Sequence, residues 1–121
     1  MRLEPLDVEL AICRLEPAAT VPAWARGELV ATVRSGEELT VVCDRAAVPD
    51  DVTAERGWRA LRVAGRLDLT LTGVLAAILA PLAAAEVPIF AVSSFDTDYV
   101  LVPAARLEQA IAVLRAAGHE I

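Results

Sequence analysis

The chain has 121 residues and a formal net charge of −6, and 56% of its residues are hydrophobic although only 4% are aromatic. This length allows one compact molecule, or two small halves around a shared core, and the core must be aliphatic. Because the chain has no lysine, a Schiff-base enzyme and a P-loop are both excluded. The acidic net charge and the scattered positions of the arginines argue against nucleic acid as a partner.

The first half of the chain predicts a shortened β-α-β-β pattern. Alternating or β-branched residues predict three strands, at residues 7–15, 29–34 and 39–43. Thr20 is a candidate N-cap for a short helix with Pro22 in its first turn. The polar connection at residues 48–55 is the natural boundary, so we expect an N-terminal half at 1–55 and a C-terminal half at 56–121.

The second half predicts the order β-α-β-β-α-β. Its strands are expected at residues 58–63, 87–92, 98–102 and 119–121, and its helices at 73–85 and 103–117. Thr72 is placed to cap the first helix, and Gly118 suits the end of the second. Pro81 conflicts with the first helix, because it removes the hydrogen bond to the carbonyl of Ala77 and should kink the backbone.

This order of elements is ferredoxin-like and belongs to the α+β class. We expect two halves with antiparallel sheets and with the helices on one face of each sheet. The large share of apolar residues on so short a chain also predicts a homodimer that buries part of them.

The connection between the last two long strands, Ser93-Ser94-Phe95-Asp96-Thr97-Asp98, is the most polar point of the second half. A tight hairpin would need fewer residues and a glycine. The connection therefore suits the presentation of side-chain oxygens, and it is the first place to expect a ligand. Its alternative interpretation is a polar loop stabilised by local hydrogen bonds.

Other residues indicate little chemistry. Cys13 and Cys43 lack a CxxC pattern and are expected to be reduced core thiols in a cytoplasmic protein. His119, the only histidine, lacks partners for a triad or a metal site and is expected on the surface. Asp68 is interpreted as a solvated turn residue. No signal peptide or membrane span is expected.

The second half resembles the small ACT-domain proteins through its GRLDLTLTGVLAAILAPLA and SSFDTDYVLVP segments. The resemblance is greatest to the tandem-ACT group related to CASTOR-type arginine sensors and to the regulatory ends of aspartate kinases. It covers residues 58–121 well and the first half weakly. It implies two ACT-like halves that bind an amino acid at an interface, with no catalysis and no cofactor.

The resemblance also implies where the ligand would bind. Backbone N–H groups at the start of the first helix of the second half would meet the ligand carboxylate, and the polar connection would hold its other polar groups, with Asp98 beside a cation. The candidate ligand-binding residues are Leu71, Thr72, Gly73, Val74, Ser93, Ser94, Phe95, Asp96 and Asp98.

The sequence thus predicts a cytoplasmic, homodimeric regulatory module that binds an amino acid and signals to a partner protein. Two alternatives remain open. The fold could serve as a dimeric scaffold that binds nothing small, or as a regulatory subunit of an amino-acid biosynthetic enzyme whose catalytic site lies on another chain.

Overall fold

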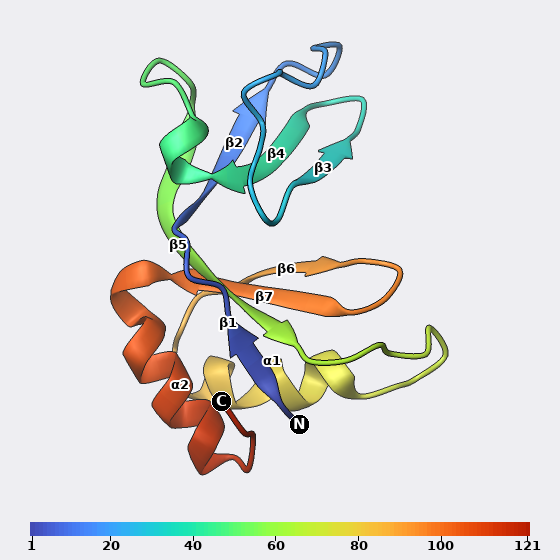
Figure 1. The fold of residues 1–121 in the computed structure, drawn as a ribbon, viewed down its shortest axis with the longest axis vertical. Helices are drawn as coiled ribbons and strands as arrows, with labels where there is room; N and C mark the ends of the chain where they lie inside the picture. The colour runs from blue at the N-terminus through green and yellow to red at the C-terminus, as the bar shows by residue number, and fades with distance from the viewer. The chain divides into compact units, whose positions relative to one another are not determined.

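The computed structural model describes all 121 residues, which divide into two compact units. Met1–Asp7 and Arg59–Ile121 form one, here called the helical unit, and Val8–Trp58 form the other, the β unit (Figure 1). The β unit is therefore inserted into the chain of the helical unit. The division expected after residue 55 falls inside a strand, and it groups Met1–Asp7 with the β unit rather than with the helical unit.

The helical unit contains β1 (Leu3–Pro5), the last residues of β5 (Ala54–Val63), α1 (Val74–Ala84), β6 (Phe90–Ser93), β7 (Asp98–Pro103) and α2 (Leu107–Ala116). A 3₁₀ turn at Ala104–Arg106 precedes α2. Its strands lie in the order β1-β5-β7-β6. The two helices and the three longer strands predicted for this part of the chain are confirmed.

The fourth strand position of the helical unit is filled from the opposite end of the chain. Only a single bridge, between Arg2 and Glu120, forms where a strand was predicted at residues 119–121. β1 instead pairs antiparallel with β5, with Leu3 opposite Val63. That prediction was wrong because Leu3 is almost fully buried in the core and β1 pairs with β5 through three residues, whereas the C-terminal residues form only that one bridge.

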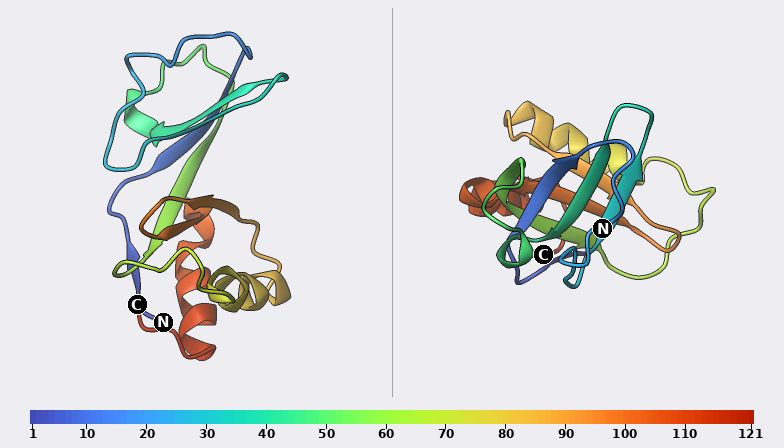
Figure 2. Two further views of the ribbon diagram at one scale, coloured as in Figure 1. Left: turned by 90° about the vertical axis from the view of Figure 1, so that its right-hand side faces the viewer. Right: turned by 90° about the horizontal axis from the view of Figure 1, so that it is seen from above.

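Both helices of the helical unit cover the same face of its strands (Figures 1 and 2). The core between them is aliphatic, as expected. It is built from the sheet residues Leu3, Leu61, Val63, Val100 and Val102 and the helix residues Val74, Ile78, Leu82, Ala110 and Leu114. Because these side chains recur at helical spacing on α1 and α2 and on one side of the strands, each element buries one face.

α1 is capped differently from the prediction. Its N-cap is Gly73, in the left-handed region at φ 83°, and no side chain caps the helix, so the expected role of Thr72 is wrong. Pro81 lies inside the helix. His119 is buried rather than exposed, and its Nε2 lies 3.0 Å from the carbonyl oxygen of Ala77.

The β unit contains β2 (Leu10–Leu15), β3 (Ala31–Arg34), β4 (Leu39–Asp44), a 3₁₀ turn at Arg45–Ala47 and the first residues of β5. The strands predicted at residues 29–34 and 39–43 are confirmed. The helix predicted after Thr20 is absent, and a single turn closes there through the hydrogen bond from Ala25 N–H to the Pro22 carbonyl. One turn bounded by Pro17 and Gly27 is too short to nucleate a helix.

The strand order of the β unit is β3-β4-β2-β5. The first strand of this unit along the chain, β2, therefore lies between the third, β4, and the fourth, β5. In the helical unit β5 lies in the same way between β7 and β1, so β1 takes the position that the fourth strand has in the β unit. The β unit is therefore similar to the helical unit in its strands and differs from the expected ACT-like half by having no α-helix.

Cys13 and Cys43 are free thiols in the core of the β unit, as predicted. The two residues lie on neighbouring strands, because Cys13 is opposite Val41 and Cys43 is opposite Ala11. Burial raises the pKa of the Cys13 thiol to about 11, with Cys43 as a smaller contributor. Both thiols are therefore protonated, unreactive core residues near neutral pH.

Candidate functional site

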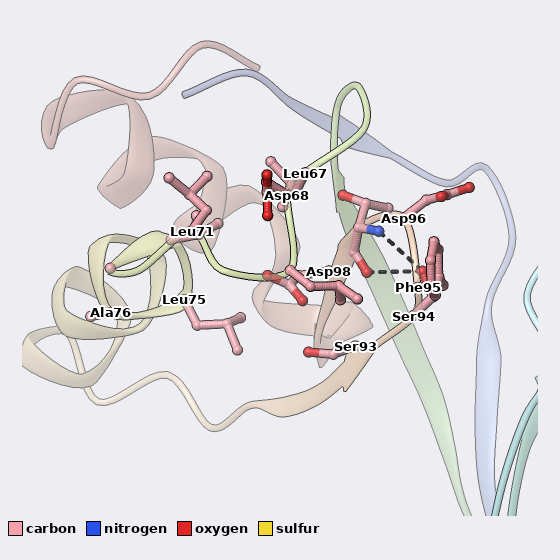
Figure 3. Close-up of a pocket in the computed structure, with 14 residues that line it drawn as sticks. Leu67, Asp68, Leu71, Leu75, Ala76, Ser93, Ser94, Phe95, Asp96 and Asp98 are labelled. Atoms are coloured by element: carbon pink, nitrogen blue, oxygen red, sulfur yellow. Dashed lines mark hydrogen bonds between the residues drawn. The ribbon is translucent and has the colours of Figure 1, made fainter.

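A cavity of about 370 Å³ lies in the helical unit between the start of α1 and the end of the β6–β7 hairpin (Figure 3). The loop of residues 64–73 forms its third side. Eight of the nine predicted ligand-binding residues line it: Leu71, Gly73, Val74, Ser93, Ser94, Phe95, Asp96 and Asp98. Thr72 does not line the cavity. Two segments that are twenty residues apart in sequence are thus brought to one space.

The α1 side of the cavity offers unpaired backbone donors. The first hydrogen bond of the helix runs from Ala77 N–H to the Gly73 carbonyl at 3.0 Å, so the N–H groups of Val74, Leu75 and Ala76 have no partner in the helix. The first turn carries no acidic residue. This end of α1 therefore keeps the positive potential of a helix N-terminus and can bind an anionic group.

The hairpin side of the cavity is more tightly folded than predicted. Ser93 pairs with Asp98, and the chain reverses in the four residues between them. The Ser94 hydroxyl donates to the Thr97 carbonyl at 2.9 Å and accepts from Thr97 N–H at 3.2 Å. The prediction that this connection is too long for a tight hairpin was wrong, because no residue of the turn has a positive φ that would require glycine, and the bonds of the Ser94 hydroxyl hold the turn closed.

Thr97 anchors the hairpin to the sheet. Its side chain is buried, and its hydroxyl donates to the Val63 carbonyl at 2.7 Å. Leu67 N–H donates to the Asp96 carbonyl at 2.7 Å and so ties the loop at residues 64–73 to the same turn. These bonds fix the distance between two of the cavity's three sides.

The carboxylates around the cavity have different roles. Asp98 forms no ion pair, and Figure 3 shows its side chain together with that of Ser93 on the side of the hairpin that faces α1. Asp96 is paired with Arg66, whose Nε lies 3.3 Å from its Oδ1. The Arg66 guanidinium also lies 5.7 Å from the centre of the Phe95 ring. Of the two hairpin carboxylates, Asp98 is therefore the one that is available to a ligand.

Asp68 is exposed, as predicted, and it also organises its own loop. Its Oδ1 accepts from the backbone N–H of Thr70 at 2.9 Å and from the Thr70 hydroxyl at 2.8 Å. These bonds stabilise the ionised form and hold the pKa of Asp68 below its usual value.

Six further residues line the cavity that were not among the predicted ones: Leu67, Asp68, Leu69, Leu75, Ala76 and Thr97. Leu75 and Ala76 follow the predicted Val74 in the first turn of α1, and that adjacency was a usable signal. The loop leucines carried no such signal, because nothing in the sequence shows that the loop folds back over the cavity.

A comparison with protein families identifies the fold that carries this cavity. The ACT domain model matches residues 53–116, more than half of the chain. The chain belongs to the ACT domain family. A second model, of an N-terminal domain, matches residues 9–51 of this ACT protein. A search of curated proteins found no match.

Solved structures support this assignment. Protein Atu0741 from Agobacterium tumefaciens is 34% identical, with a TM-score of 0.93 over 98% of this chain and 90% of its own. Protein VC0802 from Vibrio cholerae, described as a possible transport protein, is 18% identical, with a TM-score of 0.78 over 96% and 88%. The regulatory subunit of aspartate kinase from Thermus flavus is 14% identical, with a TM-score of 0.65 over 95% of both chains, and so shares the fold.

No helix is long and apolar enough to cross a membrane. No group of three or more histidine, cysteine, aspartate or glutamate side chains is arranged to hold a metal ion.

Proposed function

We propose that this ACT-domain protein is a non-catalytic regulatory module whose cavity binds a free amino acid. One observation carries the proposal. Unpaired N–H groups at the start of α1 and the unpaired carboxylate of Asp98 line the same cavity. A free amino acid has the two charges that match them.

In the proposed complex, the α-carboxylate accepts hydrogen bonds from the N–H groups of Val74, Leu75 and Ala76. The α-ammonium group donates to Asp98, where a charge-assisted bond is strongest. The hydroxyl of Ser93 can accept a further bond. The cavity volume falls within the roughly 300–1,000 Å³ that is usual for small-molecule sites.

We further propose that the protein works as a homodimer and that the ligand changes how the two copies associate. Three of its most exposed apolar side chains surround the cavity: Leu69, Leu71 and Phe95. A second copy packed on them would shield both these side chains and the ligand from water. The ligand then favours one arrangement by its differential contacts, and a partner protein responds to that arrangement.

The test is a thermal unfolding screen of the purified protein with each of the twenty amino acids at millimolar concentration. A ligand present at about 100 times its Kd should stabilise the native protein by about 2.7 kcal/mol, which raises the Tm. Analytical ultracentrifugation with and without that amino acid then tests the dimer. The lack of a Tm increase with all twenty would contradict the proposal and favour a scaffold.

A further inference from the structure

Pro81 and His119 have complementary roles at one backbone carbonyl of the helical unit, that of Ala77. Pro81 has no N–H, so it cannot donate to the carbonyl of Ala77 one turn earlier in α1. His119 supplies a donor there instead, with its Nε2 at 3.0 Å from that carbonyl oxygen. A carbonyl can only accept, so the ring proton is assigned to Nε2.

The ring of His119 is held in place by the backbone on both of its sides. Gly118 has φ 97°, and His119 N–H donates to the Leu114 carbonyl at 3.1 Å in the turn that ends α2. The next residue, Glu120, donates to the Met1 carbonyl at 2.9 Å. His119 is 9% exposed as a residue, and its Nδ1 is buried without a partner. The bond from Nε2 to the Ala77 carbonyl is therefore the only hydrogen bond of this buried ring.

A chain of peptide groups connects this bond to the cavity. In the α-helical pattern, the N–H of Ile78 donates to the carbonyl of Val74. That carbonyl belongs to the same peptide group as the N–H of Leu75, a residue that lines the cavity. A donor on the Ala77 carbonyl polarises the peptide that carries the Ile78 N–H, and hydrogen-bonded chains strengthen cooperatively.

We propose that His119 is a positioning residue for the cavity. It replaces the donor that Pro81 lacks, and it thereby orders and polarises the first turn of α1, whose free N–H groups face the ligand. The effect on ligand affinity rests on the function proposed above. The effect on the backbone of α1 does not, so the two can fail separately.

The backbone effect is tested in the full chain without ligand, by NMR of the amide protons of Ile78 and Leu75 and by thermal unfolding. His119→Phe keeps a buried ring and removes the donor, so both amide signals should shift upfield and the Tm should fall. His119→Gln places an amide nitrogen at the position of Nε2 and should restore both. His119→Asn is the matched control, because its shorter amide does not reach Ala77.

Pro81→Ala provides the second half of a double-mutant cycle. It supplies an N–H to the Ala77 carbonyl, so His119→Phe should lower the Tm and shift the amides much less in the Pro81→Ala protein than in the wild type. Equal effects in the two backgrounds would show that His119 only fills space, and would overturn the proposal. A lower Tm with unmoved Ile78 and Leu75 signals would overturn it as well.

The ligand effect is measured with the same twenty L-amino acids as probes. For any that binds, His119→Phe should weaken the affinity by roughly 1.3- to 5-fold, because the bond of the ligand carboxylate to Leu75 N–H loses about 10–30% of its strength, and Pro81→Ala should recover it. Unchanged affinity would overturn the positioning role. If no amino acid binds the wild type, the proposed function fails, and the amide shifts and the double-mutant cycle alone decide whether His119 replaces the missing donor.

Discussion

At the scale of single residues, Asp98 is available to bind a ligand, whereas Asp96 takes part in local structure. They lie two residues apart on the same hairpin, yet Asp96 is paired with Arg66 and Asp98 with no group of the chain. A carboxylate that already has a cationic partner gains less from a ligand ammonium group than one that has none. Substitution of each residue in turn therefore compares a carboxylate that is free for a ligand with one that is paired within the hairpin region.

We predict that Asp98→Asn folds normally and loses most of the Tm increase given by the bound amino acid. Loss of a charge-assisted bond of about 1.5–3 kcal/mol weakens binding by roughly 10- to 150-fold. Isothermal titration calorimetry measures this change directly. Asp96→Asn is the control and should retain affinity. An Asp98→Asn protein with unchanged affinity would remove Asp98 from the site.

Cys13 gives a prediction about pH and reactivity. With its pKa raised to about 11, Cys13 has roughly a hundredfold less thiolate at pH 8 than an ordinary cysteine. Alkylation by iodoacetamide, followed by mass spectrometry, should be correspondingly slow in the folded protein and fast in denaturant. Below pH 9 the Cys13 thiol is protonated in both the folded and the unfolded state, so it adds no pH dependence to the stability. Between about pH 9 and pH 11 the unfolded state loses this proton and the folded state keeps it, so the free energy of unfolding should fall as the pH rises.

At the scale of elements, α1 owes its start to backbone conformation. Gly73 adopts φ 83°, and a Cβ built on it would meet no atom within 4 Å. The only penalty for a side chain there is the left-handed conformation itself. Since Gly73 precedes the three free N–H groups, its conformation also sets where they lie.

We therefore predict that Gly73→Ala lowers the free energy of unfolding by about 1–2 kcal/mol and weakens ligand binding. Gly36→Ala is the matched control, because Gly36 has equally open surroundings without a positive φ, so its stability should change little. Urea denaturation measures both. If the two variants lost the same stability, the left-handed conformation of Gly73 would not be the cause.

The elements also show where sequence patterns were sufficient. The spacing of apolar residues identified α1, α2, β4 and β7, because each buries one regular face. The helix expected after Thr20 failed because its signals were local caps without an apolar face to bury. Gly73 occupies the N-cap position in place of Thr72, and because it has no side chain the first N–H groups of α1 stay uncapped.

At the scale of the whole molecule, the most consequential feature is that the helical unit uses both ends of the chain. β1 lies beside β5, and Leu3 belongs to the core of the helical unit. Backbone hydrogen bonds join Glu120 to Met1 and to Leu3, at 2.9 and 2.7 Å. A C-terminal fragment that begins at residue 56 would lack an edge strand and part of its core.

We predict that residues 56–121 alone do not fold cooperatively, as measured by circular dichroism during thermal unfolding. A permuted chain in which Ile121 is linked to Met1, so that it runs from Arg59 to Ile121 and on to Asp7, restores β1 and should fold. Cooperative unfolding of the 56–121 fragment near the wild-type Tm would show that β1 is dispensable.

Much of the candidate site was predictable from sequence. Its two segments carried visible signals: a glycine at the start of an apolar helix, and oxygens between two buried strands. The roles within the hairpin were not predictable, because Ser94 and Thr97 use their hydroxyls for bonds to the backbone. The ion pair of Asp96 with Arg66 joins residues thirty positions apart, and no local pattern indicates it.

By itself, the sequence determined the identity of most elements and the aliphatic character of the core, because burial of one face leaves a periodic trace in the residues. Only the tertiary structure decided three other features. These are the pairing of β1 with β5 at the edge of the helical unit, the bond from His119 that replaces the donor missing at Pro81, and the polar groups that stay free at the cavity. These outcomes depend on contacts between residues far apart in sequence. Such contacts leave no periodic signal, since each is made once.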